Sequence, residues 1–194
     1  ATVYAGTFQY GVFKSNNGGT SWTERIEGLL DLHIPAIAID PTNPAIVYAG
    51  TLEAGIFRSA NGAASWTAIN TGLPEFFITS SLTLDPIHPA TLYAALSGEG
   101  VFKTTDSGAH WQAMKEGLEE EVLPLAIDPQ DPATVYAGTA PSGIFKTTDG
   151  GVNWRISSEG ITNLFIATTS FYEGLFVYSI AVDPSNPSTL YLGT

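Results

Sequence analysis

The sequence predicts an all-β protein built from repeats of about 44 residues, each folding into four short antiparallel strands. Three observations support this prediction. A Tyr-centred segment recurs along the chain, a Gly-x-Phe segment recurs in phase with it, and runs rich in Val, Ile, Tyr, Phe and Thr alternate with Gly, Pro, Asn and Asp. No segment has the period of an amphipathic helix. The recurrent tyrosines are Tyr4, Tyr48, Tyr93, Tyr136 and Tyr191, at spacings of 44, 45, 43 and 55 residues.

The first predicted strand of each unit is an apolar run that ends in Asp-Pro-x-x-Pro. Because proline has no backbone N–H and a fixed φ, this segment stops the strand in a rigid turn. The Asp side chain is the expected acceptor of that turn. The four copies are "AIDPTNP" at Ala38, "TLDPIHP" at Thr83, "AIDPQDP" at Ala126 and "AVDPSNP" at Ala181.

The remaining strands of each unit follow in a fixed order. The second strand contains the recurrent tyrosine, and the third is the Gly-x-Phe segment that starts at Gly11, Gly55, Gly100 and Gly143. The fourth begins at a recurrent tryptophan, which is Trp22, Trp66, Trp111 or Trp154. Four antiparallel strands in about 44 residues are typical of a β-propeller blade.

The turn between the third and fourth strands carries the most specific motif. Residues 15–22, 104–111 and 147–154 match Ser/Thr-x-Asp/Asn-x-Gly-x-x-Trp, and residues 59–66 match it except that Ala63 replaces the glycine. On these stretches the chain resembles the Asp-box, or BNR repeat, β-propellers. That class includes sialidases, xyloglucan-degrading glycoside hydrolases, sortilin-type receptors and the photosystem II assembly factors. The resemblance implies that each motif forms the hairpin between strands three and four; we call these four stretches the box hairpins.

This phase predicts how the blades are divided along the chain. With strands named A to D from the centre outward, the chain reads as B-C-D of one blade, full blades near 34–70, 77–115 and 122–157, and A-B of another. As repeats, the single propeller domain or propeller segment divides into about 1–44, 45–89, 90–132, 133–187 and a partial repeat 188–194. The last segment duplicates the first, so we expect part of a larger ring, or a ring of about eight blades completed by a second copy. Open blade edges favour such self-association.

The residue types of the box hairpins predict a structural role. The third residue is a short side-chain acceptor, expected to bond backbone N–H groups one or two residues on. The tryptophan is expected to pack against the neighbouring sheet. Four separate side chains do not build one oxygen cage, so no metal site is predicted. The third residues are Asn17, Asn61, Asp106 and Asp149.

Composition excludes several classes of function. The net charge is −12, from 19 acidic and 7 basic residues, which argues against nucleic acid and anionic membrane surfaces as partners. The chain has no cysteine, which excludes disulfide scaffolds, thiolate metal sites and cysteine nucleophiles. No apolar run approaches the roughly 20 residues of a membrane span, so membrane insertion is not expected. No cofactor motif is present. The resemblance implies an extracellular, cell-surface or periplasmic location.

Function is expected where the repeats differ, on the face formed by the B–C and D–A connections, opposite the box hairpins. From tryptophan to the Asp-Pro aspartate the repeats span 18, 19, 17 and then 29 residues, so the last D–A connection carries an aromatic-rich insertion. Aromatic side chains on such a face stack on sugars or anchor a protein. The candidate ligand-binding residues are Phe8, Tyr10, Glu53, Glu99, Phe76, Phe77, Phe171 and Tyr172.

Three functions fit these features. The first is a non-catalytic, exported or cell-surface propeller that binds protein or glycan through the variable face. The alternative is a glycoside hydrolase, or a piece of one, whose acids come from Glu53, Glu99 and the run Glu119, Glu120 and Glu121. The second alternative is an assembly factor of the photosystem II type. A sialidase is disfavoured, because the only arginines are Arg25, Arg58 and Arg155 and the Arg-Ile-Pro element is absent.

Overall fold

Short strands joined by tight turns make up the whole of the described chain. The computed structural model describes residues 1–161 and 176–194, and these contain strands and turns but no helix. The strands are β1 (Val3–Gly6), β2 (Val12–Ser15), β3 (Thr23–Arg25), β4 (Ala36–Ile39), β5 (Val47–Gly50), β6 (Ile56–Ser59), β7 (Thr67–Ala68), β8 (Thr79–Leu84), β9 (Leu92–Leu96), β10 (Gly100–Thr104), β11 (Gln112–Ala113), β12 (Glu121–Ile127), β13 (Val135–Ala140), β14 (Gly143–Thr147), β15 (Arg155–Ile156), β16 (Ser179–Val182) and β17 (Leu190–Gly193).

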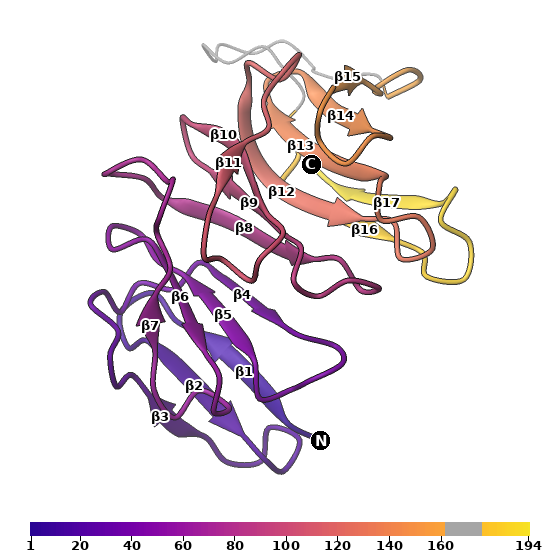
Figure 1. Cartoon of the computed structure of the whole chain (residues 1–194). Coiled ribbons are helices and arrows are strands. Elements are labelled where there is room, and N and C mark those ends of the chain that lie inside the picture. Colours follow the sequence, from indigo (N-terminus) through magenta and orange to yellow (C-terminus); the bar gives the residue numbers. More distant parts are fainter. Residues whose placement is uncertain (162–175) are drawn as a thin grey trace, which may run out of the picture.

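The strands form five antiparallel sheets in which chain order equals spatial order. Three sheets are four-stranded, β4 to β7, β8 to β11 and β12 to β15, while β1 to β3 form a three-stranded sheet and β16 and β17 a pair. The predicted phase of B-C-D, three full blades and A-B is confirmed. Figure 1 shows the sheets following one another around an arc, from the indigo first sheet to the yellow last pair. Among the described residues, no hydrogen bond joins the last sheet to the first.

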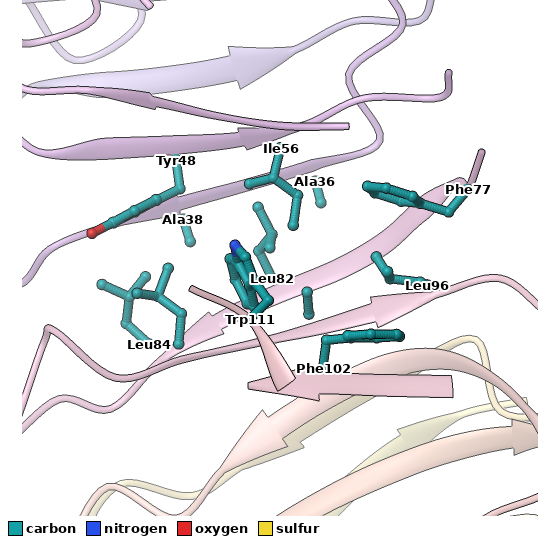
Figure 2. Packing of buried hydrophobic residues seen from close by; sticks show 12 residues of the cluster. Ala36, Ala38, Tyr48, Ile56, Phe77, Leu82, Leu84, Leu96, Phe102 and Trp111 are labelled. Carbon is teal, nitrogen blue, oxygen red and sulfur yellow. The ribbon is translucent and has the colours of Figure 1, made fainter. Parts of the chain in front are cut away.

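The hydrophobic core lies between successive sheets rather than at one centre. The cluster between the second and third sheets contains Tyr48, Leu82, Leu96 and Trp111, whose side chains point into the same layer (Figure 2). Equivalent clusters fill the other three interfaces. Each interface is therefore a packed layer between two blades, as the alternating apolar pattern of the strands requires.

The box tryptophans seal these layers. Trp66, Trp111 and Trp154 are only 5%, 3% and 3% exposed. Each indole Nε1 donates to a backbone carbonyl of the preceding blade, at 2.8 to 3.0 Å; the acceptors are Arg25, Ile69 and Met114. The predicted packing of the box tryptophan against the neighbouring sheet is confirmed at these three positions. The ring of Trp22, in the first sheet, is 42% exposed.

The hydrogen bonds of the box turn differ from those predicted from the sequence. The third residue accepts the backbone N–H four residues on, not one or two; Asp149 Oδ1, for example, accepts from the N–H of Asn153 at 2.9 Å. The short-range bonds come instead from the first residue, since Thr147 Oγ1 accepts the N–H groups of Asp149 and Gly151. The turn is wide enough to need both acceptors, and the sequence pattern does not reveal its width.

The Asp-Pro turns behave as predicted. Asp40 Oδ1 accepts the backbone N–H groups of Thr42 and Asn43 at 2.8 and 3.0 Å, and Asp85, Asp128 and Asp183 make the equivalent pairs of bonds. These A–B turns and the C–D box hairpins lie at one end of each antiparallel sheet. The B–C and D–A connections therefore meet at the opposite end.

Candidate ligand-binding face

A threonine fixes the B–C turns that form this face. The last residue of the Tyr-Ala-Gly-Thr segment donates its Oγ1–H to the carbonyl of the glycine four residues on: Thr7 to Gly11, Thr51 to Gly55 and Thr139 to Gly143, at 2.9, 2.7 and 3.0 Å. In the first two turns the same Oγ1 accepts a backbone N–H from within the turn. A side chain that closes its own turn holds the intervening tip residues in place.

The D–A connections join neighbouring tips into a continuous surface. The Ile34 N–H donates to the carbonyl of Thr7, and the next connection repeats this bond from Thr79 to Thr51. From the other side, the N–H of Leu52 donates to the carbonyl of His33. The first two connections are thus each bonded to the B–C tips of two successive blades, since the N–H of Ser97 likewise donates to the carbonyl of Ile78.

A polar cluster lies where the first connection meets the second tip. Asp31 Oδ1 accepts from the backbone N–H and the ring Nδ1 of His33, at 2.9 and 2.8 Å, and Asp31 Oδ2 accepts the backbone N–H of Glu53 at 2.8 Å. Phe8 packs edge-on against the His33 ring, with centroids 5.0 Å apart. Burial opposes ionisation of Asp31, but these hydrogen bonds outweigh it and hold the carboxyl pKa below its usual value.

The predicted aromatic residues divide between surface and core. Phe8, Tyr10 and Phe76 are 73%, 65% and 82% exposed on the variable loops, as a ligand-binding role requires. The prediction that Phe77 belongs to the ligand-binding face is corrected. Phe77 is 8% exposed and packs in the core between the second and third sheets, so it is not available to a ligand. Consecutive residues of an extended chain point in opposite directions, which explains the division. Phe171 and Tyr172 lie outside the described residues.

The last D–A connection adds one aromatic that the sequence-based selection did not include. Tyr178, just before β16, is 66% exposed, and its ring stacks on Phe176 with centroids 6.4 Å apart. Both belong to the aromatic-rich insertion. The aromatic-rich composition of the insertion was the sequence signal for these residues, but composition alone does not show which rings are exposed and which are packed.

A cavity of about 460 Å³ opens on the same face, beside the β9–β10 tip. Its lining comes from that tip and from the following D–A connection, which makes it strongly acidic. The charged lining residues are Glu99, Lys115, Glu116, Glu119 and Glu120. The structure thus brings Glu99 together with the acidic run, while the lining does not include Glu53.

The acidic run is partly held by serines of the neighbouring tips. Ser142 Oγ donates to Glu120 at 2.9 Å, and Ser97 Oγ donates to Glu121 at 2.7 Å. Glu116 and Glu119 face solvent. A glycosidase general acid depends on burial or on a close second charge to stay protonated, and exposed carboxylates lack the burial.

Other site types find no support in the described part of the chain. No group of three or more His, Cys, Asp or Glu residues among residues 1–161 and 176–194 is arranged to hold a metal ion. No helix in these ranges is long and apolar enough to cross a membrane. Arg25, Arg58 and Arg155 lie on β3, β6 and β15, in three different sheets.

Comparison with known proteins places the fold among β-propellers. No protein-family model and no curated protein matches the chain. Among solved structures, an ancestral GH74 enzyme aligns with a TM-score of 0.77 and 27% identity, over 98% of this chain and 25% of its own. The GH74 xyloglucanase of Xanthomonas campestris aligns at 0.71 and 18% identity, over 92% of this chain and 30% of its own. The structure of YCF48 bound to D1 peptide aligns with a TM-score of 0.63 and 14% identity, over 98% of this chain and 57% of its own.

The chain therefore spans a quarter to a third of the GH74 enzymes that it matches. The protein is an all-β chain with the β-propeller fold that GH74 enzymes and YCF48 have.

Proposed function

We propose that this propeller is an exported or cell-surface binding module without catalytic activity, which holds a protein or glycan ligand on its variable face. The observation that carries the proposal is the exposure of Phe8, Tyr10 and Phe76 on loops whose backbones are fixed by hydrogen bonds. Large rings held on a rigid surface bind at low entropic cost, which favours ligand recognition over chance exposure.

Charge narrows the class of ligand. The chain has a net charge of −12, and the cavity beside the β9–β10 tip has four glutamates and one lysine in its lining. Neutral glycans and basic protein segments are compatible with this surface, whereas sulfated or uronic-acid polymers are repelled. Both ligand classes have precedents on this fold, since one similar propeller binds the D1 peptide and others are xyloglucanases.

Binding to peptide and glycan arrays tests the proposal. The double variant Phe8→Ala/Tyr10→Ala and the single variant Phe76→Ala are expected to weaken binding of any ligand found by about tenfold or more, as loss of an aromatic anchor does. Val152→Ala is the matched control, because Val152 is 56% exposed but belongs to a box hairpin at the opposite end. A ligand whose binding is unaffected by the aromatic variants and reduced by the control would refute the assignment of the face.

A glycoside hydrolase is the second candidate, supported by one observation. Glu99 shares the 460 Å³ cavity with Glu116, Glu119 and Glu120, and paired carboxylates are what glycoside hydrolysis requires. Incubation with xyloglucan and a panel of other polysaccharides tests it. Turnover that is abolished by Glu99→Gln and retained in Glu75→Gln, an exposed acid outside the cavity, would establish this candidate. Absence of turnover on every polymer would count against this candidate.

A further inference from the structure

The third residue of the box hairpins differs between the first two copies and the last two. Asn17 and Asn61 are each followed by glycine, whereas the other two copies have aspartate at this position. An asparagine followed by glycine is the pair of residues that deamidates most readily, because glycine has no Cβ to keep its backbone nitrogen away from the side-chain amide. The hairpin of Asn61 connects β6 and β7 in a complete four-stranded sheet, and Asn61 is exposed to solvent.

Hydrogen bonds of the turn engage both groups that would react. The Asn61 Oδ1 accepts from Ser59 Oγ and from the backbone N–H of Ser65, each at 2.9 Å, and Asn61 Nδ2 donates to Ser65 Oγ at 2.9 Å. The backbone N–H of Gly62 donates to the Ala45 carbonyl, in the turn between β4 and β5, at 2.8 Å. The side-chain amide and the nitrogen that would attack it are therefore each held by a partner of their own.

We propose that the pair Asn61 and Gly62 is a site of spontaneous deamidation, that opening of the box turn sets the rate, and that the aspartate produced fits the same turn. In the first step the Gly62 backbone nitrogen gives up its proton to water or hydroxide and bonds to Asn61 Cγ. The Cγ–Nδ2 bond breaks, Nδ2 takes up a proton and leaves as ammonia, and a cyclic succinimide remains.

Water completes the reaction in one of two ways. Addition of water at Cγ breaks the bond from Cγ to the Gly62 nitrogen, which takes up a proton, and leaves an ordinary aspartate. Addition at the Asn61 backbone carbonyl carbon breaks the other bond to that nitrogen and leaves isoaspartate, in which the main chain runs through Cβ and Cγ. Water enters and ammonia leaves, so the conversion needs no oxidant or reductant. It is independent of the ligand-binding face, which lies at the other end of the sheets.

The folded turn opposes the first step. For the Gly62 nitrogen to reach Cγ, its N–H must leave the Ala45 carbonyl, and the departure of Nδ2 breaks the bond to Ser65. The reaction therefore takes place in the fraction of molecules whose turn has opened locally, and its rate falls as the free energy of that opening rises. An intact turn thus preserves the asparagine at position 61.

The fourth box hairpin shows how the same turn holds an aspartate. Asp149 Oδ1 accepts the backbone N–H of Asn153 at 2.9 Å, as Asn61 Oδ1 accepts that of Ser65. The second atoms differ, since Asp149 Oδ2 accepts from Asn153 Nδ2 whereas Asn61 Nδ2 donates to the Ser65 hydroxyl. A serine hydroxyl donates as well as accepts, so Ser65 can turn its O–H toward an aspartate at position 61. Isoaspartate lengthens the main chain of the turn, so it cannot keep this set of bonds.

The charge of the aspartate product also suits the interface between blades. Lys103 Nζ donates to a carbonyl in the box hairpin of Asp149 at 2.9 Å, as Lys14 Nζ does in that of Asn61 at 3.0 Å. Burial lowers the pKa of Lys103, and the charges of Asp85 and Asp149 oppose that shift. An aspartate at position 61 is placed in the same way relative to Lys14. The product therefore adds an attraction across the interface.

Peptide mapping by mass spectrometry on the 194-residue chain tests the site and its protection. At mildly alkaline pH, Asn61 is expected to convert about tenfold or more slowly in the folded chain than in the chain unfolded by guanidinium chloride. Asn153 is the internal control, since it lies in a box hairpin but precedes Trp154, whose side chain hinders the attack; it is expected to remain asparagine in both states. Equal rates at Asn61 in the two states, or no conversion in the unfolded chain, would overturn the proposal.

A pair of variants tests whether the turn sets the rate. Ser65→Ala removes the acceptor of Asn61 Nδ2 and is expected to speed conversion in the folded chain by about two- to tenfold, as loss of one hydrogen bond does, with no change in the unfolded chain. Thr67→Ala is the matched control, because it removes an exposed hydroxyl from β7 that has no hydrogen bond to Asn61 within the described residues. Equal rates in the two variants would show that the turn bonds do not control the reaction.

The product is tested by placing it directly in the turn. Asn61→Asp is expected to keep the urea midpoint of the parent chain at neutral pH, or to raise it slightly at low salt, because its carboxylate retains the acceptor and faces Lys14. Asn61→Ala loses all the side-chain bonds and is expected to lower the midpoint. A midpoint lowered equally in both variants would refute the fit of the aspartate.

Discussion

Replacing Trp111 by alanine tests the source of the stability of this fold. The Trp111 ring is 3% exposed between the second and third sheets, and its Nε1 donates to the Ile69 carbonyl at 2.8 Å. Burial of about 150–250 Å² of aromatic surface at ~25 cal/mol/Å² gives an upper limit of about 4–6 kcal/mol. Core tryptophan-to-alanine changes typically cost about 3–5 kcal/mol, so we expect the free energy of unfolding to fall by about that amount.

The matched control is the equivalent residue of the first sheet. Trp22 has the same place in its box hairpin, but its ring is 42% exposed and its indole has no acceptor within the described residues. With roughly half the area buried and no hydrogen bond lost, Trp22→Ala is expected to cost about 2 kcal/mol or less. Trp111→Phe, which keeps an apolar ring but loses the indole bond, is expected to fall between the two.

Urea unfolding followed by far-ultraviolet circular dichroism measures all three differences. Dilute protein is required, so that self-association does not add to the apparent stability. Equal losses in Trp22→Ala and Trp111→Ala would refute the reasoning, because they would show that the box tryptophan stabilises its own hairpin rather than the layer between blades. A loss below about 1 kcal/mol in Trp111→Ala would also refute it, because the buried ring would then contribute little to the stability of the layer.

Three further predictions follow from individual contacts. Gly72→Ala, with φ +92° and the Trp111 carbonyl 2.3 Å from the new Cβ, is expected to cost about 2 kcal/mol or more by urea unfolding, and clearly more than Gly18→Ala, where φ is also positive but the space is open. Hydrogen bonds, chiefly from the side chains of His110 and Asn153, lower the pKa of Asp106 and Asp149 from 3.8 to about 2. Their contribution to stability is therefore present above about pH 4 and lost as the pH falls toward 2, so Asp106→Asn/Asp149→Asn should flatten the acid limb of a plot of melting temperature against pH; an unchanged acid limb would contradict this. Asp31→Ala removes the acceptors of three hydrogen bonds and is expected to cost about 1–2 kcal/mol and to speed amide exchange of Glu53, while exchange unchanged at that amide would show that Asp31 does not hold the tip.

Much of the fold could be predicted because the blade is a local structure whose sequence pattern recurs in four copies. The Asp-Pro turns, the recurrent tyrosines and the box tryptophans each identify one strand boundary, and their constant order fixes the phase of all five sheets. The candidate face could be located in the same way, as the end of the sheets opposite the box hairpins. The predicted hydrogen bonds of the box turn were wrong, because which backbone N–H a side chain can reach depends on the width of the turn.

The individual site residues were harder to predict. Phe76 and Phe77 are adjacent and alike in sequence, yet one is 82% exposed and the other is in the core. Asp31 and His33 were not selected, although they tie the first D–A connection to the tip at Glu53. Whether a loop residue bonds a neighbouring loop depends on contacts across two blades, which a pattern within one repeat does not contain.

By itself, the sequence determined the blade, its strand order and the end of the sheets where the repeats diverge, because periodic turn residues act within a few positions along the chain. Only the tertiary structure decided which copies of each motif are packed against a neighbouring blade. Trp66, Trp111 and Trp154 are buried and bonded while Trp22 is half exposed, and Gly28, Gly72 and Gly117 face a carbonyl while Gly160 has none within 4 Å of it among the described residues. The motifs are nearly identical in sequence, and the difference arises because burial depends on whether another blade is packed against them.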